Sequence, residues 1–587
     1  MQPSQFHPSL PSRAGPVGRP CLMIAAVAVA APRMARIGTR RLGRSLGRRL
    51  GHGGREGRRN LSIAARARRQ DLKLVTVIRS QAGPKAERLR RLPAAELAKD
   101  TSWAQDPAVF VHAGSIQPRP WLGFGGSFTE ASAETLRQMS PGRRREVLES
   151  YFHPVRGLGY NLGRVPIGSC DFSLDSWTCG DLREGDLSLE GFSLERYEAA
   201  ILPFMRDAAE VCGTPLTILA SPWSPPPWMK THRTFHGEGR LLPACRDAWA
   251  RHFVRFVKEM NAAGVPIWGV SVQNEPEAAQ CWESCIYSAD EERIFVRDHL
   301  GPTMGEAGLA DVKILVWDHN RDAMLERAAA IYDDPVAAQM VWGVAYHWYG
   351  DARFETWPPR AEVPFEDRQM EGANVLELKA CAGFDNVRQV ADLRPDKHIL
   401  FTEGCQELGG RPLESVIGDW KLGERYAMNI IADMNSGCEG WIDWNLVLDQ
   451  EGGPNHVGNY CVAPVICDTR TDKVLYQPSF WSLGHFSRYI RPGARRLLCS
   501  TTRDALEVTA YQNPDGGIAV VVLNQSKDSI DFWFKVKEAS NQRAVPLRSP
   551  RRSIQTILVD DGRDDVWPSR LIRSLPSSLQ KACAELW

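Results

Sequence analysis

The sequence predicts an α/β fold, a closed (β/α)8 barrel of the TIM type, joined to an antiparallel β-sandwich domain. From about residue 121, eight short apolar runs alternate with longer amphipathic stretches, which is typical of parallel βαβ units and, at eight repeats, of a barrel. From about residue 489, strand-like runs follow one another through turns without helices between them, as in antiparallel sheets. A chain of 587 residues is long enough for a large catalytic domain and an appendage.

The eight predicted barrel strands span residues 121–127, 160–165, 216–220, 267–274, 312–317, 341–347, 398–403 and 438–446. The helices between them are clearest at residues 140–152, 246–263 and 422–435. Residues 246–263 carry aromatic and aliphatic side chains at the spacing of one helix face. Each strand therefore precedes a helix that could cover the outside of the barrel.

The predicted sandwich strands span residues 506–511, 517–523, 531–536 and 553–559, and an Asn-Pro-Asp-Gly turn at residues 513–516 separates the first two. Residues 108–113 would add a strand from the segment before the barrel. We therefore expect four parts, in this order: a basic leader for targeting, or disordered, at 1–95, a strand segment of the side domain at 96–120, the barrel at 121–488 with an insertion near 353–384, and the sandwich at 489–587.

The N-terminal head is strongly basic. Its first 70 residues carry 15 arginines, no lysine and one acid, a charge of +14, so the rest of the chain carries −12. Nothing in that acidic remainder resembles a nucleic-acid-binding surface. The head could bind RNA or acidic lipid, but its composition favours a leader, and the apolar run at residues 21–31 has signal-peptide rather than membrane-span length. A secretory signal and an organelle transit peptide remain alternatives, so the compartment stays open.

Cysteine spacing suggests local pairs and no metal site. Cys170 with Cys179, and Cys281 with Cys285, are close enough in sequence to form disulfides within loops, in a compartment that permits them. The second pair has no matching Cys or His pair at zinc spacing, and His347 has no metal-binding partners in its neighbourhood of the sequence. The 19 tryptophans lean towards carbohydrate binding, because flat aromatic faces pack on sugar rings.

Two glutamates, Glu275 and Glu403, each end an apolar run and are followed at once by Pro276 or Gly404. In parallel barrels the C-terminal ends of the strands hold the active site. Two carboxylates on two such ends are the minimal equipment for cleaving a glycosidic bond. Either glutamate alone could be a solvated or helix-capping residue, so their neighbours decide the interpretation.

Eight motifs, in order between residues 109 and 560, carry a resemblance: GFGGSFTEA, YNLGRVPIGSCDFS, LASPWSPPPWMKT, VSVQNEP, AYHWY, LFTEGC, GWIDWNLVLDQEGGPNHVGNY and PSFWSLGHFSRYI. On these motifs the chain resembles glycoside hydrolase family 30, in the branch that contains the glucosylceramidases (acid β-glucosidases). NEP alone occurs in several related barrel families, whereas SPW…PPPWMKT together with WNLxLDxxGGPN points to this branch. The resemblance implies a (β/α)8 barrel with a side β-domain and retaining hydrolysis of a β-glucosidic bond.

The resemblance also implies roles for individual residues. By motif, Glu275 takes the acid/base role, Glu403 takes the nucleophile role, and Arg164 braces the nucleophile. The residues that would hold the glucosyl ring are Asp171, Trp223, Asn274, His347, Tyr349, Trp444 and Asn455. The basic head and an extra stretch at about 353–384 lie outside the resemblance.

A retaining site needs carboxyl groups about 5–5.5 Å apart, one ionised and one protonated. We expect Arg164, with a hydroxyl such as that of Tyr349, to keep Glu403 ionised by charge and hydrogen bonding. Glu275, less well paired and close to that charge, should have a raised pKa and serve as the acid. Glu277 is the nearest rival for this role, although it should already lie in the loop. The two carboxylates suffice for the chemistry, so no cofactor is expected.

The sugar-holding residues have plainer alternatives. Asn274 would donate its amide to the sugar 2-hydroxyl, or it is simply a turn residue. Asp171 would accept bonds from two ring hydroxyls, or it caps a helix together with Ser173. Trp223 and Trp444 could be core aromatics, although both follow strand ends.

Three functions compete. The leading prediction is a glycoside hydrolase, a β-glucosidase acting on glucosylceramide or a similar lipid β-glucoside, with transient contact to a membrane surface. The second is a β-glucanase or β-xylosidase on the same scaffold. The third, ranked last because both carboxylates are present, is a carbohydrate-binding protein without catalysis. The oligomeric state cannot be read from the sequence.

Overall fold

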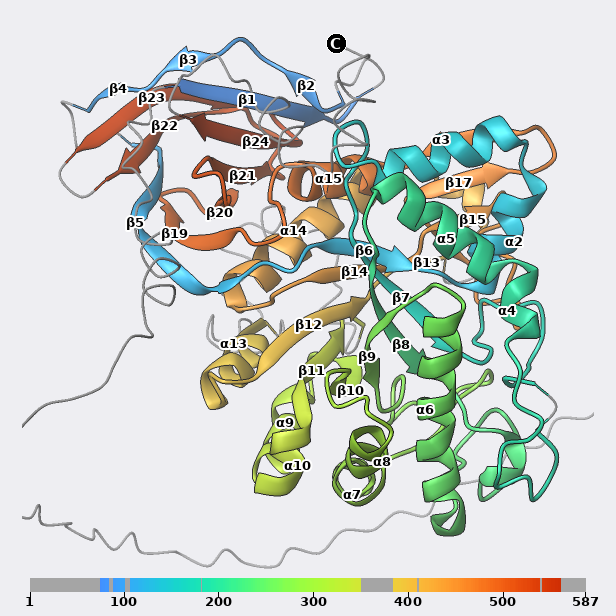
Figure 1. Ribbon diagram of the computed structural model, residues 1–587. Coiled ribbons are helices and arrows are strands. Elements are labelled where there is room, and N and C mark those ends of the chain that lie inside the picture. The colour runs from blue at the N-terminus through green and yellow to red at the C-terminus, as the bar shows by residue number, and fades with distance from the viewer. Residues whose placement is uncertain are drawn as a thin grey trace, which may run out of the picture. The chain divides into compact units, whose positions relative to one another are not determined.

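The computed structural model describes residues 74–83, 88–100, 106–180, 182–349, 384–408, 411–538 and 541–560 (Figure 1). Residues 1–73 of the predicted leader (1–95) and most of the predicted insertion near 353–384 lie outside these residues. Within them, no helix has the length and apolar character that crossing a bilayer requires.

The larger domain is a closed barrel of eight parallel strands, as predicted. All eight predicted strands are present, with the closing pair between the first and the last. The strands are β6 (Phe124–Ser127), β7 (Leu162–Ile167), β8 (Thr217–Pro222), β9 (Ile267–Ser271), β10 (Lys313–Asn320), β11 (Val341–His347), β12 (His398–Glu403) and β14 (Trp441–Asn445). Strand β9 ends three residues earlier than predicted, so residues 272–275 form a bend above the barrel.

Helices cover the outside of this barrel (Figure 1). The three helices predicted most clearly correspond to α3 (Pro141–Phe152), α6 (Arg246–Ala262) and α14 (Trp420–Ser436). Helix α3 begins at Ser140, whose hydroxyl caps it, and α14 ends at Gly437 in the left-handed conformation that glycine tolerates. Among the described residues, the other helices of five residues or more are α2 (Glu130–Gln138), α4 (Glu195–Ala199), α5 (Ile201–Cys212), α7 (Ala289–Ile294), the π-helix η3 (Phe295–Leu300), α8 (Gly301–Glu306), α9 (Met324–Tyr332), α10 (Pro335–Met340), α13 (Phe384–Leu393) and α15 (Pro478–Ser487).

The second domain is a β-sandwich that both ends of the described chain build. Its strand order is β2-β1-β24-β21-β20-β19-β5-β22-β23-β4, with β3 beside β1. The strands are β1 (Leu74–Gln81), β2 (Arg90–Arg91), β3 (Ala95–Glu96), β4 (Ala98–Lys99), β5 (Ala108–Pro120), β19 (Arg495–Thr501), β20 (Leu506–Gln512), β21 (Ile518–Asn524), β22 (Ile530–Lys537), β23 (Gln542–Ser549) and β24 (Ser553–Asp560). Their inward side chains form a core of their own, separate from that of the barrel.

The predicted leader boundary at residue 95 is wrong. Strand β1 pairs with β24 along its whole length, from Leu74 opposite Asp560 to Gln81 opposite Ser553. Its sequence LVTVIRSQ is mostly buried, because it lies inside the sheet with neighbours on both sides. The arginine-rich composition extended the leader prediction over a segment that is an integral strand. Strand β5, in turn, runs seven residues beyond the predicted end at 113 and leads directly into the barrel.

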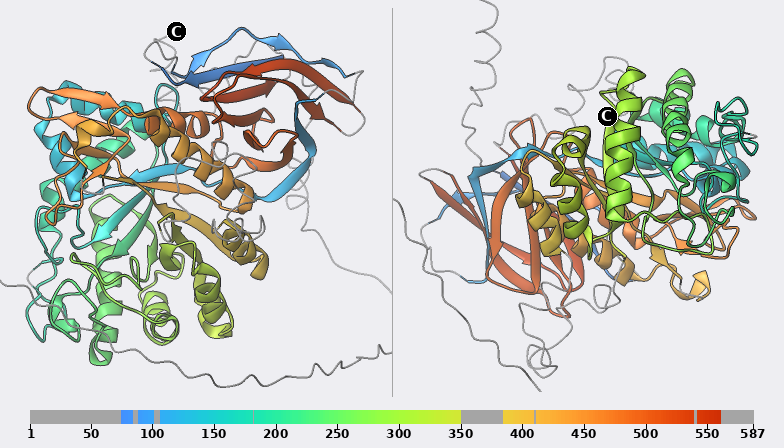
Figure 2. Two further views of the ribbon diagram at one scale, coloured as in Figure 1. Left: turned by 180° about the vertical axis from the view of Figure 1, so that it is seen from behind. Right: turned by 90° about the horizontal axis from the view of Figure 1, so that it is seen from below.

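The two domains share a packed seam, in which α14 and α15 contact β20, β21 and β24 (Figures 1 and 2). His485 of α15 bonds to Thr556 Oγ1 and to Ser80 Oγ, both at 2.9 Å. Burial lowers the pKa of His485 to about 3, so its ring is neutral at ordinary pH. The seam is therefore held by apolar packing, by these uncharged hydrogen bonds and by an ion pair between Glu424 of α14 and Arg552 at 2.5 Å.

Two smaller strand groups lie above the barrel strands and shape its mouth. Strands β13 (Gln406–Glu407) and β16 (Cys461–Val462) form an antiparallel pair. Strands β15 (Val447–Asp449), β17 (Val465–Asp468) and β18 (Lys473–Tyr476) form a three-stranded sheet. These elements hold the loop at residues 450–460 close to the end of β12.

Candidate active site

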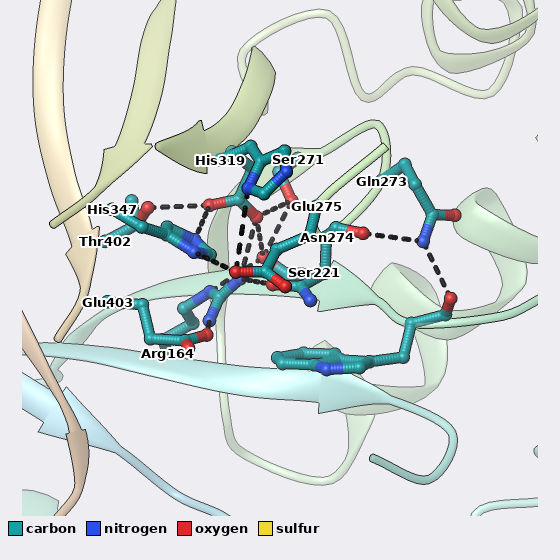
Figure 3. Close-up of polar contacts among 12 residues, drawn as sticks. Arg164, Ser221, Ser271, Gln273, Asn274, Glu275, His319, His347, Thr402 and Glu403 are labelled. Carbon is teal, nitrogen blue, oxygen red and sulfur yellow. Dashed lines mark hydrogen bonds and ion pairs between the residues drawn. The ribbon is translucent and has the colours of Figure 1, made fainter. Parts of the chain in front are cut away.

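Arg164 of β7 is the centre of the candidate site, and its side chain is fully buried (Figure 3). Its Nη1 donates to Glu403 Oε2 at 2.5 Å. Its Nη2 donates to Asn274 Oδ1 at 2.7 Å and to Asp318 Oδ2 at 2.8 Å. Its Nε donates to Ser221 Oγ at 3.0 Å. One guanidinium thus joins four barrel strands or the bends that follow them, and the prediction that Arg164 contacts Glu403 is met by the geometry.

Asp318 enters the site through a bulge in β10. The register against β11 steps from Trp317 opposite Ala345 to His319 opposite Tyr346, which leaves Asp318 as an extra residue. Trp317 and Asp318 both have positive φ angles, 74° and 48°. Bulges re-aim side chains in this way beside active sites. The predicted strand ended at residue 317, so the sequence analysis missed this carboxylate.

Asp318 is the most heavily bonded carboxylate of the site. Besides the guanidinium bond, it accepts from Ser221 at 3.0 Å, Ser271 at 2.5 Å and Thr402 at 2.6 Å. Its Oδ1 also lies 3.1 Å from His347 Nε2. Burial alone would raise its pKa, but the neighbouring positive charges and these bonds hold the pKa of Asp318 well below its ordinary value. Asp318 is therefore a permanent anion that orients the groups around it.

Glu403 ends β12 and is followed by a tightly packed glycine. A Cβ atom on Gly404 would lie 2.9 Å from ring atoms of both Trp348 and Phe401, so the chain turns there without room for a side chain. The expected hydroxyl contact of Glu403 is not made, because Tyr349 Oη donates instead to Cys405 Sγ at 3.3 Å. Tyr349 is thus bonded to the residue two positions beyond Glu403 and not to Glu403 itself.

Glu275 stands in the bend after β9 with a φ of 46°, an uncommon conformation for a residue with a side chain. Its Oε1 lies 3.1 Å from His347 Nδ1 and 3.6 Å from His319 Nδ1. The rival Glu277 is half exposed and pairs with Arg327 at 3.6 Å, outside the network of Arg164. The geometry therefore favours Glu275 over Glu277 as the functional carboxylate of this segment.

The pKa directions of the two glutamates are the reverse of those expected. Burial raises the pKa of Glu403, and the opposing effects of His347 and Arg164 do not cancel this rise, to which the charge of Glu275 adds. For Glu275, burial also raises the pKa, but His319, His347 and Arg164 outweigh it, and the net pKa is lowered. The reason is the pair of histidines beside Glu275, which the sequence did not place there. The ligand-free pair thus keeps its first negative charge on Glu275.

His347 lies between two carboxylates and is fully buried. Burial lowers its pKa, but the charge of Glu403 and the bond to Asp318 raise the pKa of His347 to about 9. Contrary to the sequence analysis, it has potential metal partners, because one ligand atom each of Glu275, His319 and His347 lie within 4.8 Å of one another. At neutral pH, however, the imidazole ring of His347 is protonated on both nitrogens. A proton therefore occupies the nitrogen that a metal ion would need.

Asp171 faces the site from the turn after β7. Its Oδ2 accepts from Asn455 Nδ2 at 3.4 Å and from Asn459 Nδ2 at 3.1 Å. Residues 171–175 form a turn and bend, so the alternative of a helix cap with Ser173 is wrong. Burial raises the pKa of Asp171 well above its ordinary value, and the charge of Glu403 raises it further.

Two tryptophans form an aromatic floor under the guanidinium. The rings of Trp223 and Trp444 stack with centroids 5.2 Å apart and an interplanar angle of 23°. The guanidinium carbon of Arg164 lies 4.7 Å from the first ring centroid and 5.6 Å from the second. Gln273 Nε2 donates to the carbonyl oxygen of Trp223 at 2.7 Å, which ties the floor to the bend that carries Glu275 (Figure 3). Both tryptophans are buried next to the charged network rather than in the apolar core of the barrel.

Two family models match the chain. The TIM-barrel domain of glycosyl hydrolase family 30 matches residues 122–386 and 367–490, and the β-sandwich domain of the same family matches residues 493–557. The chain belongs to glycoside hydrolase family 30. It is a glycoside hydrolase with the barrel and sandwich that the sequence predicted.

Relatives within family 30 include the lysosomal acid glucosylceramidase of Mus musculus, which is 33% identical over 447 residues, 74% of this chain and 80% of that protein. The crystal structure of SrfJ from Salmonella typhimurium has a TM-score of 0.72 at 32% identity, over 83% of this chain and 99% of that one. The endo-β1,6-glucanase BT3312 has a TM-score of 0.68 at 25% identity, over 82% of this chain and 99% of that one.

The family 30 site contains polar residues that sequence reasoning did not find. Asp318 follows directly on a predicted strand, as Glu275 does, but the bulge in β10 that turns it into the site left no signal in the sequence. Asn459 lies in the same motif as Asn455 and makes the shorter bond to Asp171. Ser221, Ser271 and Thr402 gave no signal, because single hydroxyl residues in strands are common.

The sequence left open whether the cysteines that are close in sequence form disulfides or stay free thiols, and the structure has them free. Cys170, Cys179, Cys281 and Cys285 are all free thiols. Cys179 Sγ lies 3.9 Å from Tyr197 Oη, and Cys281 is exposed whereas Cys285 is buried. Nearness in sequence did not bring these sulfur atoms together, because each member of a pair points into a different environment.

Proposed function

We propose that this family 30 hydrolase is a retaining β-glucosidase acting on glucosylceramide or a similar lipid β-glucoside. In this proposal Glu403 is the nucleophile and Glu275 is the acid and then the base. The observation that carries it is the bonding of Arg164, which holds Glu403, Asn274 and Asp318 around one guanidinium. A single cation thereby orients a nucleophile, a residue adjacent to the acid/base and a fixed anion.

In the first step, Glu403 attacks the anomeric carbon while Glu275 protonates the departing oxygen. This step needs a proton on Glu275 and a carboxylate on Glu403. In the ligand-free site, however, the pKa of Glu275 is lowered and that of Glu403 is raised, which favours a shared proton on Glu403. A proton shared by the pair has to pass from Glu403 to Glu275, a shift that leaves the total charge of the cluster unchanged. The 2.5 Å bond from Arg164 stabilises the Glu403 carboxylate that this shift creates.

In the second step, Glu403 is an ester and has no charge. In the ligand-free site His319, His347 and Arg164 outweigh burial and lower the pKa of Glu275. Glu275 is then ionised and can take a proton from the attacking water. The two histidines near Glu275 favour this ionised form.

The hydrogen bonds that the site residues already make determine which of their polar atoms are left to orient the sugar. Asn274 Oδ1 accepts from Arg164, so its amide NH2 faces away and can donate to the sugar 2-hydroxyl. Asn455 and Asn459 both donate to Oδ2 of Asp171. Among the described residues no donor to Oδ1 is seen, which leaves that oxygen for sugar hydroxyls.

The lipid part of the proposal rests on similarity and on exposed apolar groups. The mouse relative is named a lysosomal acid glucosylceramidase. Leu174, three residues after Asp171, is 50% exposed, and Tyr460, next to Asn459, is 41% exposed. Large apolar side chains left exposed beside a sugar site suit an aglycone with a hydrocarbon chain, or a membrane surface that presents it.

A glucanase is the second candidate, favoured by the structural similarity to an endo-β1,6-glucanase. Turnover of glucosylceramide in vesicles, compared with turnover of soluble β-1,6-glucan and an aryl β-glucoside, tests the choice. We expect the lipid to be hydrolysed faster than the glucan, and faster hydrolysis of the glucan would overturn the lipid proposal.

The variants Leu174→Ser and Tyr460→Ser test the aglycone surface. Each should raise KM for the lipid several-fold and leave KM for the aryl glucoside within about twofold, because a few apolar contacts contribute on the order of 1 kcal/mol. Leu187→Ser, at a position 44% exposed in the loop before α4, is the matched control and should affect neither substrate.

A further inference from the structure

Two buried thiols meet at the mouth of the barrel. The Sγ atoms of Cys405 and Cys461 lie 3.0 Å apart, although 56 positions separate the residues in sequence. Their exposed fractions are 5% and 1%. Among the described cysteines, no other pair of sulfur atoms is within hydrogen-bonding distance.

Both thiols lie on segments that the catalytic site depends on. Cys405 is two residues after Glu403, and Cys461 is two residues after Asn459, which bonds to Asp171. The sulfur pair therefore lies between the loop of the proposed nucleophile and the loop that orients a proposed sugar ligand.

The backbone around the pair is already held in place. Strands β13 and β16 pair antiparallel, with Gln406 opposite Val462 and Glu407 opposite Cys461. The Tyr349 hydroxyl donates to Cys405 Sγ at 3.3 Å and so keeps that sulfur on the side of its partner. A disulfide has sulfur atoms about 2.0 Å apart, so closure needs a movement of roughly 1 Å, within the reach of side-chain rotation.

We propose that Cys405 and Cys461 are a modification site, at which two-electron oxidation by a peroxide forms a disulfide that clamps the nucleophile loop to the loop carrying Asn459. This inference does not depend on which glycoside the enzyme hydrolyses.

The chemistry balances with hydrogen peroxide as the oxidant. One thiolate attacks a peroxide oxygen, the O–O bond breaks, and a sulfenic acid and water result after proton uptake. The second thiol then attacks the sulfenic sulfur, the S–S bond forms, and a second water leaves. Two thiols and one peroxide thus give one disulfide and two waters.

Burial slows this reaction near neutral pH. It raises the pKa of Cys405 well above the ordinary thiol value. The bond with Cys405 lowers the pKa of Cys461, but burial together with the nearby charges of Asp171, Glu407 and Glu403 outweighs it, and the net pKa of Cys461 is raised. Because the thiolate is the nucleophile, oxidation should be slow at pH 7 and faster at pH 9.

The first test is direct detection of the bond. The intact protein is treated with hydrogen peroxide at pH 7 and at pH 9, unfolded in the presence of a maleimide, digested and analysed by mass spectrometry. We expect a peptide pair that joins Cys405 to Cys461, two hydrogens lighter than the two free peptides, and lost after dithiothreitol. If both cysteines carry the maleimide at pH 9, or either is a sulfinic acid, the proposal is overturned.

The second test measures the clamp without using activity. A disulfide that closes a loop of this length should raise the thermal midpoint, followed by tryptophan fluorescence, by about 2–6 °C, reversibly with dithiothreitol. The variant Cys461→Ala should lose both the linked peptide and this shift. Cys467→Ala removes a buried thiol without a sulfur neighbour. This variant, like the wild type, should keep the linked peptide and the shift of the thermal midpoint. An oxidised, linked protein with an unchanged midpoint would show that the bond does not clamp the loops.

Discussion

The interior of the barrel has two layers with opposite chemistry, built by the same strands. One layer is an apolar plug at the N-terminal end of the strands, formed by Leu162, Leu219, Leu315, Ala345, Leu400 and Ile442. The other is the hydrogen-bonded layer with Arg164 at its centre. On five strands the two layers are two residues apart, since side chains two apart point to the same face. The pairs are Leu162/Arg164, Leu219/Ser221, Ala345/His347, Leu400/Thr402 and Ile442/Trp444.

The sixth strand, β10, departs from this two-residue spacing. In β10 the plug residue is Leu315, but the site residue is Asp318, three positions on, because the bulge at Trp317 shifts the alternation. The plug follows strand periodicity alone, whereas the charged layer also uses a bulge and the bend that carries Glu275. We infer that the plug stabilises the barrel and the charged layer holds the chemistry, and substitutions two residues apart on one strand can separate these roles.

The largest effect is expected from Arg164→Met. It leaves Asp318 and Glu403 buried without their cation and removes the donor that orients Asn274, so kcat should fall by about 10²–10³-fold. Unfolding free energy should also fall, by about 3–5 kcal/mol. Steady-state kinetics and denaturant unfolding measure both, with Arg164→Lys as a charge-preserving comparison that should recover part of the stability. Activity of Arg164→Met near that of the wild type would remove the guanidinium from the mechanism.

A substitution in the plug should lower stability and leave kcat nearly unchanged. Leu400→Ala creates a cavity below the site, and we expect a loss of unfolding free energy of about 2–5 kcal/mol. The kcat of the folded fraction should stay within about twofold, because the layer above keeps its bonds. A fall in kcat as large as that of the arginine variant would mean that the two layers are one functional unit.

His347 makes stability depend on pH in a defined window. Its pKa is about 9 in the folded protein, against about 6.5 in an unfolded chain. The folded state therefore holds the extra proton between these values, so this stabilisation is complete below pH 6.5 and is lost as pH rises through 9. The shift corresponds to about 3 kcal/mol. Denaturant unfolding from pH 6 to 10 should show this loss in the wild type and a much smaller one in His347→Gln; equal slopes would contradict the assignment.

The smallest effect is expected from Thr402→Val, two residues from the plug residue on the same strand. It removes one of five side-chain donors to Asp318, and the remaining four keep that carboxylate bonded. We expect a loss of about 1–2 kcal/mol in unfolding free energy and less than a tenfold fall in kcat. An inactive but folded variant would show that Asp318 needs every donor.

Most of the regular secondary structure of this molecule could be predicted from the sequence, whereas the bulge, the bends and the contacts of the site could not. The eight barrel strands and the clearest helices follow from periodicity, because apolar spacing sets which face is buried. Strand β1 was missed since the basic composition before it extended the leader prediction, and β23 because Pro546 and several charged or polar side chains weaken its pattern. In the site, the two glutamates and Arg164 were found through their motifs.

What could not be predicted depends on three-dimensional proximity. The bulge that presents Asp318, the histidines that lower the pKa of Glu275, and the bond from Tyr349 to Cys405 all join residues far apart in sequence. The same holds for the Cys405–Cys461 contact, which spans 56 positions, whereas the cysteine pairs close in sequence stayed apart. Local spacing carries no information on such contacts.

Covalent trapping tests the proposed roles of Glu403 as the nucleophile and Glu275 as the acid/base. A 2-deoxy-2-fluoro β-glucoside with a good leaving group should form a glycosyl-enzyme that accumulates, because the fluorine slows both steps. Peptide mapping of the intact protein should place the sugar on Glu403 alone. In Glu275→Ala, added azide should release β-glucosyl azide, since azide needs no base to attack the intermediate. A label on Glu275 or any other carboxylate, or an α-azide product, would contradict the account.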